Sequence, residues 1–223
     1  MRGVEDALRI AERSGDDFAL SVARVALGVA LMHRQTAPEC DRGQRLLAEV
    51  SEEFLRRGYL LADRPIVDVY LARERARRGD RNNAIPVTRA AADDLVRQGQ
   101  LLQWGIPATG VLVEALLDRG ADGDVVEAEA AIERLAAAPT DESLALRDIW
   151  LSRLRALLAR ARGDAATYAH LRDRYRDMAR TLGFEGISTG PRPCPDGVHR
   201  RQSVRCGNHQ SVGRGGPQPR RMA

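Results

Sequence analysis

The 223-residue chain contains no lysine, only three cysteines and few aromatic side chains, which make up 4% of its residues. We attribute the exclusive use of arginine as the basic residue to GC-rich coding. Three cysteines do not make a disulfide framework in a chain of this length, and no apolar run approaches the roughly eighteen residues that span a membrane. Met1 to Asp6 carry charge and lack the apolar core of a signal peptide. We therefore expect a reduced, cytoplasmic, globular protein without a membrane segment.

The sequence also has little that indicates catalysis. It contains no P-loop glycine pattern, no GxGxxG and no HExxH. We therefore predict no catalytic, cofactor-binding or metal-binding residue, and no enzyme wholly contained in this chain. A hidden enzyme is the alternative, and it requires a polar pocket with acids of shifted pKa.

Residues 1–183, the first four fifths of the chain, carry no net excess of positive charge. Residues 1–183 hold 28 arginines and 29 acidic residues, a net charge of −1. Residues 184–223 hold 7 arginines and 2 acidic residues, a net charge of +5. Because nucleic-acid binding requires positive charge that displaces counterions, we do not expect residues 1–183 to bind nucleic acid.

Apolar residues recur every three to four positions along residues 1–183, which predicts consecutive amphipathic helices. Stripes that include Leu8, Val25, Val50 and Tyr70 mark the first four helices. Five more helices are expected over about 80–98, 102–119, 124–137, 144–162 and 164–182. Alanine and leucine, which favour helix, dominate these stretches. No convincing alternation of β-branched residues indicates a strand, so we predict an all-α fold.

Glycine and proline mark the expected helix boundaries. Gly79-Asp80 and Gly163-Asp164 each follow an arginine-rich turn, and Gly120 follows another. Glycine suits the left-handed position after a helix, aspartate suits the N-cap of the next helix, and arginine complements the helix dipole. Pro86 is expected within an opening turn, and Pro107 indicates that its helix begins at the residue before it.

Tight joints of this kind form antiparallel helix pairs. Three expected pairs, roughly 63–99, 101–137 and 147–183, have similar lengths, which is typical of a tetratricopeptide-like solenoid. The strict repeat signature is missing. We therefore predict a degenerate tetratricopeptide-like helical-repeat solenoid over residues 1–183.

An acidic cluster is the main candidate for a metal site in this region. It consists of Asp122, Asp124, Glu127 and Glu129 near the start of an expected helix. Acidic residues are ordinary in the first turn of a helix, so we prefer this explanation to a bound metal.

The histidines and cysteine of this region do not form a catalytic set. His33 and Cys40 lie close in sequence, but no partner is spaced to complete such a set, so we expect surface or joint residues. His170 has Asp173 and Asp177 on related helix faces, and we expect solvated charge there.

Two tryptophans are candidate groove or packing residues. Because solenoids bind ligands along their concave surfaces, Trp104 and Trp150 are expected either to line a groove or to pack between neighbouring helices, and packing is preferred.

Residues 184–223 have a different composition, with seven glycines and five prolines. Such a segment cannot bury a core, so we predict a disordered tail. Its Cys194, His199, Cys206 and His209 are residue types that bind zinc. The two cysteines are twelve residues apart, however, whereas a zinc finger needs a close pair. An arginine-rich arm that binds nucleic acid loosely is a further alternative.

Three stretches resemble the C-terminal helical region of a family of large mycobacterial signalling proteins. They read VYLARERARRGDRNNAIPVTRAAADDL, ATGVLVEALLDRGADGDVVEAEAAIERLA and RDIWLSRLRALLARARGDAATYAHLRDRYRDMARTLGFEG. Members of this family resemble class III adenylate cyclases fused to an AAA-type ATPase, and some end in a LuxR-type DNA-binding domain. The similarity covers about residues 3–186 and implies a sensing or scaffolding module. The family's cyclase and Walker motifs lie in domains outside this chain, so no catalytic residue is carried over.

The resemblance leads to a hypothesis about the reading frame near Gly186. The family continues after LGFEG with a phrase like HIAWAEAM, whereas this chain continues with Ile187–Pro195. Back-translation of these residues, read one base earlier, permits HIxWAEAMP and then a stop, where x is not the family's alanine. We therefore predict a one-base deletion that makes residues 187–223 an out-of-frame extension and leaves apolar surface exposed on the last helix. We also expect Met1 to fall inside a repeat array and not at a domain boundary.

These observations favour a non-catalytic regulatory or protein-interaction module that derives from a cyclase/ATPase signalling protein. Such a module binds a protein partner or a small effector along its helical groove and needs no cofactor. The alternative is a nucleic-acid-binding protein that acts through its arginine-rich tail. If truncation at Gly186 abolished nucleic-acid binding, that result would support this alternative.

Overall fold

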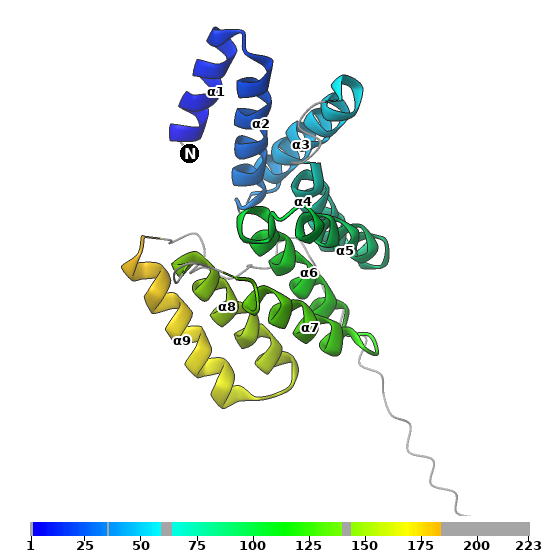
Figure 1. Cartoon of the computed structure of the whole chain (residues 1–223), viewed down its shortest axis with the longest axis vertical. Coiled ribbons are helices and arrows are strands. Elements are labelled where there is room, and N and C mark those ends of the chain that lie inside the picture. Colours follow the sequence, from blue (N-terminus) through cyan, green and yellow to red (C-terminus); the bar gives the residue numbers. More distant parts are fainter. Residues whose placement is uncertain (1, 35, 59–63, 140–143, 184–223) are drawn as a thin grey trace, which may run out of the picture.

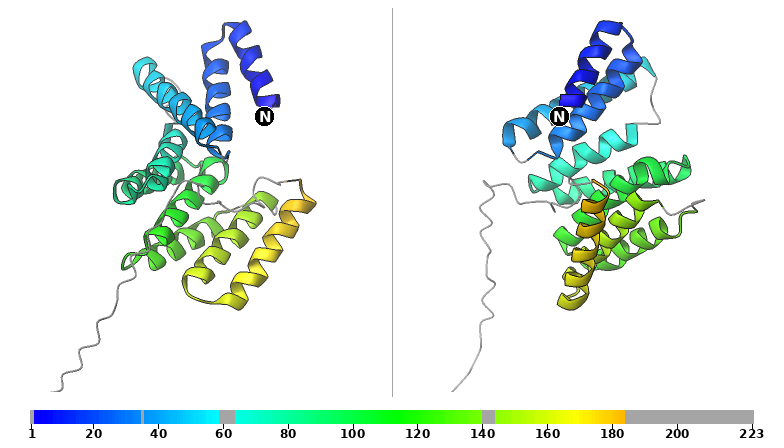
Figure 2. Two further views of the ribbon diagram at one scale, coloured as in Figure 1. Left: turned by 180° about the vertical axis from the view of Figure 1, so that it is seen from behind. Right: turned by 90° about the vertical axis from the view of Figure 1, so that its left-hand side faces the viewer.

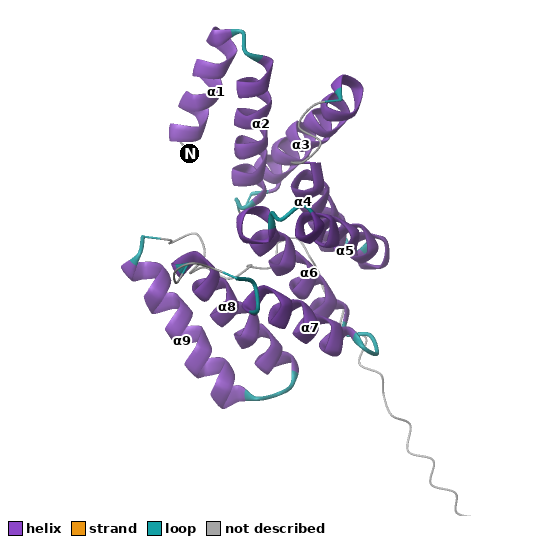
Figure 3. Ribbon diagram, viewed as in Figure 1, coloured by secondary structure: helices purple, strands orange, loops and turns teal. Residues whose placement is uncertain are grey.

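The computed structural model describes residues 2–34, 36–58, 64–139 and 144–183. Throughout these ranges the chain is helical with short loops, and it contains no strand (Figures 1 and 3). The prediction of an all-α fold is confirmed. None of the described helices combines the length and the apolar character needed to cross a membrane.

Nine α-helices and one short π-helical turn make up the described part of the chain. In order, they are α1 (Arg2–Ser14), α2 (Asp17–Met32), α3 (Ala37–Arg57), α4 (Arg64–Arg77), α5 (Arg81–Arg97), the π-helical turn η1 (Leu101–Gly105), α6 (Ile106–Arg119), α7 (Asp124–Ala136), α8 (Ala145–Ala161) and α9 (Ala165–Thr181). The predicted bounds of the last five helices differ from these by at most one residue, apart from the start of α6 taken from apolar spacing alone.

The helices pack as consecutive pairs, namely α2 with α3, α4 with α5, α6 with α7 and α8 with α9. In addition, α2 contacts α4, α4 contacts α6 and α6 contacts α8, so these four helices form a continuous row. We call α2, α4, α6 and α8 the even row. Figures 1 and 2 show that the pairs follow an arc, with α1–α2 and α8–α9 extending to the same side of α4–α6. The arrangement is that of a helical-repeat-like array.

The glycine joints have the predicted backbone geometry. Gly79, Gly120 and Gly163 have φ values of 103°, 63° and 78°. The predicted capping by aspartate is confirmed at Asp164, whose side chain accepts a hydrogen bond from the Thr167 amide at 3.0 Å. Asp80 likewise stands at the predicted N-cap position, that of α5, but its side chain caps no backbone amide.

The two prolines occupy different positions in their helices. Pro107 is the second residue of α6, so the predicted start at the preceding residue is confirmed, and η1 occupies the stretch before it. Pro86 lies inside α5 rather than in its opening turn, which corrects the prediction. Its missing N–H leaves the carbonyl of Asn82 without a helical donor. Asn82 is exposed, so water can satisfy this carbonyl.

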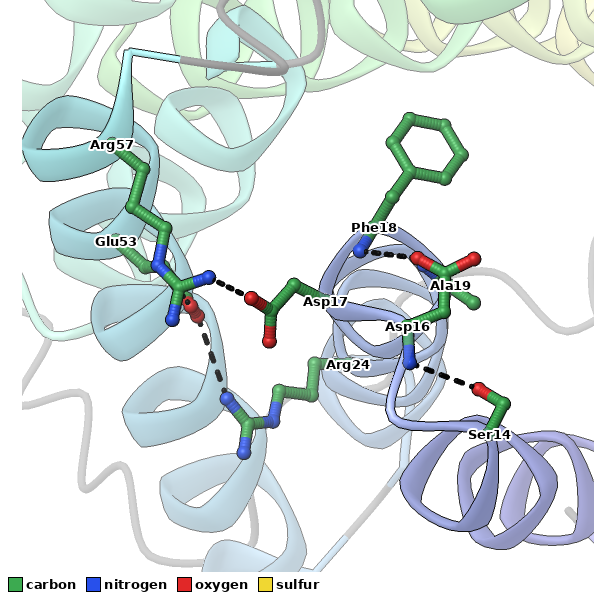
Figure 4. A network of polar contacts seen from close by, with 8 residues as sticks. All are labelled: Ser14, Asp16, Asp17, Phe18, Ala19, Arg24, Glu53 and Arg57. Carbon is green, nitrogen blue, oxygen red and sulfur yellow. Dashed lines mark hydrogen bonds and ion pairs between the residues drawn. The ribbon is translucent and has the colours of Figure 1, made fainter.

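A network of polar contacts fixes the start of α2 against the end of α3 (Figure 4). Asp16 caps α2 by accepting hydrogen bonds from the amides of Phe18 at 2.9 Å and Ala19 at 3.2 Å. Arg57 of α3 bonds to Asp17, next to this cap, and to Glu53 at 3.2 Å. These contacts hold α2 and α3 in position relative to each other. The charged groups form ion pairs and a helix cap, so we assign them a structural role.

The hydrophobic core runs along the whole array. One cluster of buried side chains, which includes Phe54 and Ile66, extends from α2 to α6, and a second, which includes Leu112 and Ile132, extends from α5 to α8. The last helix, α9, packs on α8 through a smaller cluster. Of the large apolar side chains in the described part of α9, Leu182 at its C-cap is the one that is exposed, at 48%. Tyr168, Leu171 and Met178 of α9 are only partly buried, so some apolar surface remains on the last helix, and Leu182 is the most exposed of these residues.

Candidate functional site

The acidic residues around the start of α7 do not converge on one point. Asp124 has a side chain that is 2% exposed, and it accepts hydrogen bonds from Arg119 at 2.9 and 2.5 Å. It also accepts one from the amide of Ala121 at 2.8 Å. The bonds from Arg119 lower the pKa of the Asp124 carboxyl; desolvation opposes them, and the Ala121 amide adds to the lowering.

The neighbouring carboxylates point to other helices. Glu127 accepts two hydrogen bonds from Arg89 of α5, at 2.6 and 2.8 Å, and Glu129 accepts one from Arg162 at 2.6 Å. Among the described residues, no group of three or more potential metal ligands lies together. The acids at this helix start therefore tie α7 to its neighbours through separate ion pairs.

The two candidate tryptophans both pack against the core. Trp104 lies half-buried against the first apolar cluster, and Trp150 lies half-buried against the second. The Trp150 ring faces Gly110 of α6 so closely that a Cβ atom there would lie 2.4 Å from Cζ3. The guanidinium of Arg153 lies 5.0 Å from the centroid of the Trp150 ring, within the range of a cation–π contact.

A polar cluster on the even row is the strongest candidate for a functional site. We define the central cluster as His33, Tyr70, Arg73, Glu114 and Arg153, contributed by the end of α2 and by α4, α6 and α8. His33 Nε2 lies 3.2 Å from the Tyr70 hydroxyl, and the two rings meet edge to face at 5.5 Å. This bond joins the end of α2 to α4.

The other half of the central cluster is a buried ion pair between α6 and α8. Arg153 Nη2 lies 2.6 Å from Glu114 Oε1, and their side chains are only 8% and 17% exposed. The charge of Arg153 acts on His33, and the charge of Glu114 acts on Tyr70. The two halves therefore influence each other electrostatically across the even row.

Arg73 has an unusual position in this cluster. It follows Tyr70 by three residues on α4, which places both side chains on one face of the helix. Its Nη1 atom is buried and has no hydrogen-bond partner in the described part of the chain. A buried charged nitrogen without an acceptor is costly, so native proteins normally supply a water, an ion or a ligand there.

The charges of the central cluster shift two pKa values. The pKa of His33 is lowered from 6.5 to about 4, mainly by desolvation and then by the positive charges of Arg73, Arg153 and Arg77. Desolvation also raises the pKa of Tyr70, which Arg73 opposes. At neutral pH the cluster therefore contains a neutral imidazole and a neutral phenol beside guanidinium groups. His33 as a residue keeps exposed surface, so solvent reaches the cluster.

Sequence reasoning placed His33 correctly at a joint but missed its partners. His33 is the C-cap of α2, and its partner Tyr70 lies 37 positions further along the chain. No local pattern connects these two residues. Cys40 was expected at a surface or a joint, but it is buried at the start of α3, with its thiol 3.3 Å from the Arg34 carbonyl oxygen. His170 is exposed on α9, as expected.

A separate hollow lies between the start of α4 and the end of α5. It has a volume of about 450 Å³ and is lined in part by Arg64, Asp68, Asp94 and Gln98. Desolvation raises the pKa of Asp68, and the charge of Arg64 opposes this shift. The hollow is open to solvent and joins only one helix pair, so it is a weaker candidate than the central cluster.

Several candidates of the tail lie outside the described residues. These are the zinc-type residues Cys194, His199, Cys206 and His209. The same holds for Gly186–Gly190, a GxSxG match that sequence reasoning missed. In hydrolases that motif forms a turn between a strand and a helix, whereas the described ranges contain helices and no strand.

Comparison of the chain with protein-family models, with curated proteins and with solved structures finds no match. The central cluster must therefore be interpreted from its own geometry.

Proposed function

We propose that this chain is a non-catalytic regulatory or protein-interaction module with a degenerate tetratricopeptide-like fold. The observation that carries the proposal is the central cluster, in which the His33–Tyr70 contact joins α2 to α4 and the buried Glu114–Arg153 pair joins α6 to α8. Buried polar contacts contribute less to stability than apolar packing of the same volume, and one of their known uses is to specify a particular arrangement. The resemblance to the helical region of cyclase/ATPase signalling proteins supports the same class of function.

In the proposed mechanism, binding of an effector changes the position of the two ends of the arc, α1–α2 and α8–α9, relative to each other. A protein partner or small effector binds at the central cluster and changes how α8 is held against α6, and through α6 against α4 and α2. Because α8 carries α9 with it, this change alters the position of the α8–α9 end relative to the α1–α2 end. In a larger signalling protein, domains attached to the two ends respond to that movement.

The experiment measures the distance between the two ends by electron paramagnetic resonance. Spin labels replace Arg13 and Arg174, which are exposed on α1 and α9, in a chain whose native cysteines are substituted. The double substitution Arg153→Met with Glu114→Leu removes the buried pair and keeps an apolar contact. We expect it to shift or broaden the distance distribution, because α8 then loses its polar link to the rest of the cluster.

The control is an exposed ion pair on the same helix. Arg155 of α8 bonds to Glu133 of α7 at 3.0 Å, with side chains that are 43% and 61% exposed. Replacing this pair by Met and Leu is expected to leave the distance distribution unchanged. Identical distributions for the two double variants contradict the proposed mechanism.

A further inference from the structure

The charges in and around the central cluster do not balance. Glu114 neutralises Arg153 at 2.6 Å, and Glu74 neutralises Arg77 at 3.4 Å. Arg73 forms no ion pair with the described residues, and its Nη1 atom is buried without an acceptor. One positive charge therefore remains unpaired beside the two rings of the cluster.

The groups around that charge are suited to an anion. Guanidinium is a planar donor that matches the oxygen atoms of carboxylates and phosphates. With the His33 Nε2–H donating to the Tyr70 oxygen, the single proton of the Tyr70 hydroxyl, one helical turn away from Arg73, is available to donate to the same ligand. The imidazole of His33 is neutral at neutral pH, so it neither repels nor attracts strongly. The partial burial of the cluster strengthens the attraction, because solvent screens it less.

We infer that the central cluster binds an oxyanion group, a phosphate or a carboxylate, held by Arg73 and Tyr70. The inference rests on the proposed function, since it names the chemical class of the effector. The ligand supplies the acceptor that Arg73 Nη1 lacks, and it completes the polar contacts between α2 and α4. Arg153 of α8 also acts on His33 electrostatically, so a second positive charge lies near the anion.

The test is a nuclear magnetic resonance titration of the full chain at neutral pH and constant ionic strength. The probes are inorganic phosphate in one series and succinate in the other, and the readout is the imidazole signal of His33, assigned with a His33→Gln variant. We expect a saturable shift with at least one probe. The tighter probe identifies whether the site prefers phosphate or carboxylate.

Substitutions of arginines on α4 test whether Arg73 is the residue that binds the anion. Arg73→Gln is expected to weaken binding at least about tenfold, which corresponds to the loss of one charged hydrogen bond. Arg73→Lys keeps the charge and is expected to restore part of the affinity. Arg75→Gln is the matched control, because Arg75 is exposed on another face of the same helix, and it is expected to bind like the unchanged chain.

Two outcomes overturn the inference. One is the absence of a saturable shift with both probes. The other is equal binding by the Arg73→Gln and Arg75→Gln variants, which indicates that anions associate with surface arginines in general. Neither outcome affects the distance measurement proposed above, which uses no ligand. A change in that distance without anion binding means that the ligand class is wrong and the coupling between the ends is right.

Discussion

The exclusive use of arginine has a structural consequence at the scale of single residues. Arg119 and Arg89 each donate two hydrogen bonds to one carboxylate, of Asp124 and Glu127 respectively. A lysine ammonium cannot reproduce this forked geometry, because it is a single charged point. Each of these two contacts between helices therefore consists of two hydrogen bonds, where a lysine would make a single one.

The pair of Asp124 and Arg119 predicts a dependence of stability on pH. The folded protein lowers the pKa of Asp124 below 3.8. The stabilisation is therefore fully present above that value and is lost as the pH falls through the folded-state pKa. We expect Asp124→Asn to lower the free energy of unfolding by about 1–3 kcal/mol at neutral pH, and by less below about pH 4.

Urea denaturation at several pH values checks this prediction. Asp122→Asn is the control, because Asp122 is exposed in the same loop and should have little effect on stability. A difference between Asp124→Asn and the unchanged chain that stays constant down to pH 2 would contradict the argument.

The buried pair of Arg153 and Glu114 predicts a second effect on stability. Removing one partner leaves the other charge buried without compensation, so Glu114→Gln is expected to destabilise the fold by about 3 kcal/mol. The exposed partner of Arg155 provides the comparison, since Glu133→Gln removes a surface ion pair worth about 0–1 kcal/mol. Equal unfolding midpoints for the two variants in chemical denaturation would show that Glu114 is not held in a buried pair.

At the scale of helices, the close approach of α6 and α8 depends on a glycine. Gly110 lies where a Cβ atom would meet the Trp150 ring at 2.4 Å, which is too close for ordinary contact. We expect Gly110→Ala to destabilise the protein by about 1–3 kcal/mol, because the rigid indole has to move. A calorimetric melting curve measures this loss.

Two further substitutions test the effect of Gly110→Ala, one as a control and one as a compensating change. Gly3 of α1 has open space around its Cα atom, so Gly3→Ala is expected to be neutral or slightly stabilising. Trp150→Leu in the Gly110→Ala background is expected to recover part of the loss by making room. If Gly110→Ala melts at the same temperature as Gly3→Ala, the two helices do not approach as closely as described.

At the scale of the whole molecule, we expect the apolar packing between the described helices to be sufficient to hold the array together. The apolar clusters of the described chain extend from α2 to α9. We expect a chain that ends at Gly186 to keep the melting temperature and the helical circular dichroism of the full chain. A clear drop in melting temperature would show that the later residues contribute to folding, and it would contradict the hypothesis that they are out of frame.

The helices, most of their ends and the pairing of successive helices could be predicted from the amino-acid order alone. These features depend on local physics: apolar spacing sets the buried stripe of each helix, as in Leu112 and Leu116 of α6, and glycine sets the left-handed joints, as at Gly120. The N-cap position of Asp80 is predicted correctly, but its side chain accepts a hydrogen bond from the Asn83 amide group at 2.8 Å instead of capping a backbone amide.

The meeting points of the polar residues, in contrast, depend on the packing of the folded chain. His33 and Tyr70 are 37 positions apart, and Glu114 and Arg153 lie on helices separated in sequence by α7. Their convergence depends on how the even row is stacked, which is a sum of many packing contacts and leaves no periodic trace in the sequence. For the same reason the acidic residues near Asp124 resembled a cluster in one dimension, whereas in the folded chain each forms contacts with a different element.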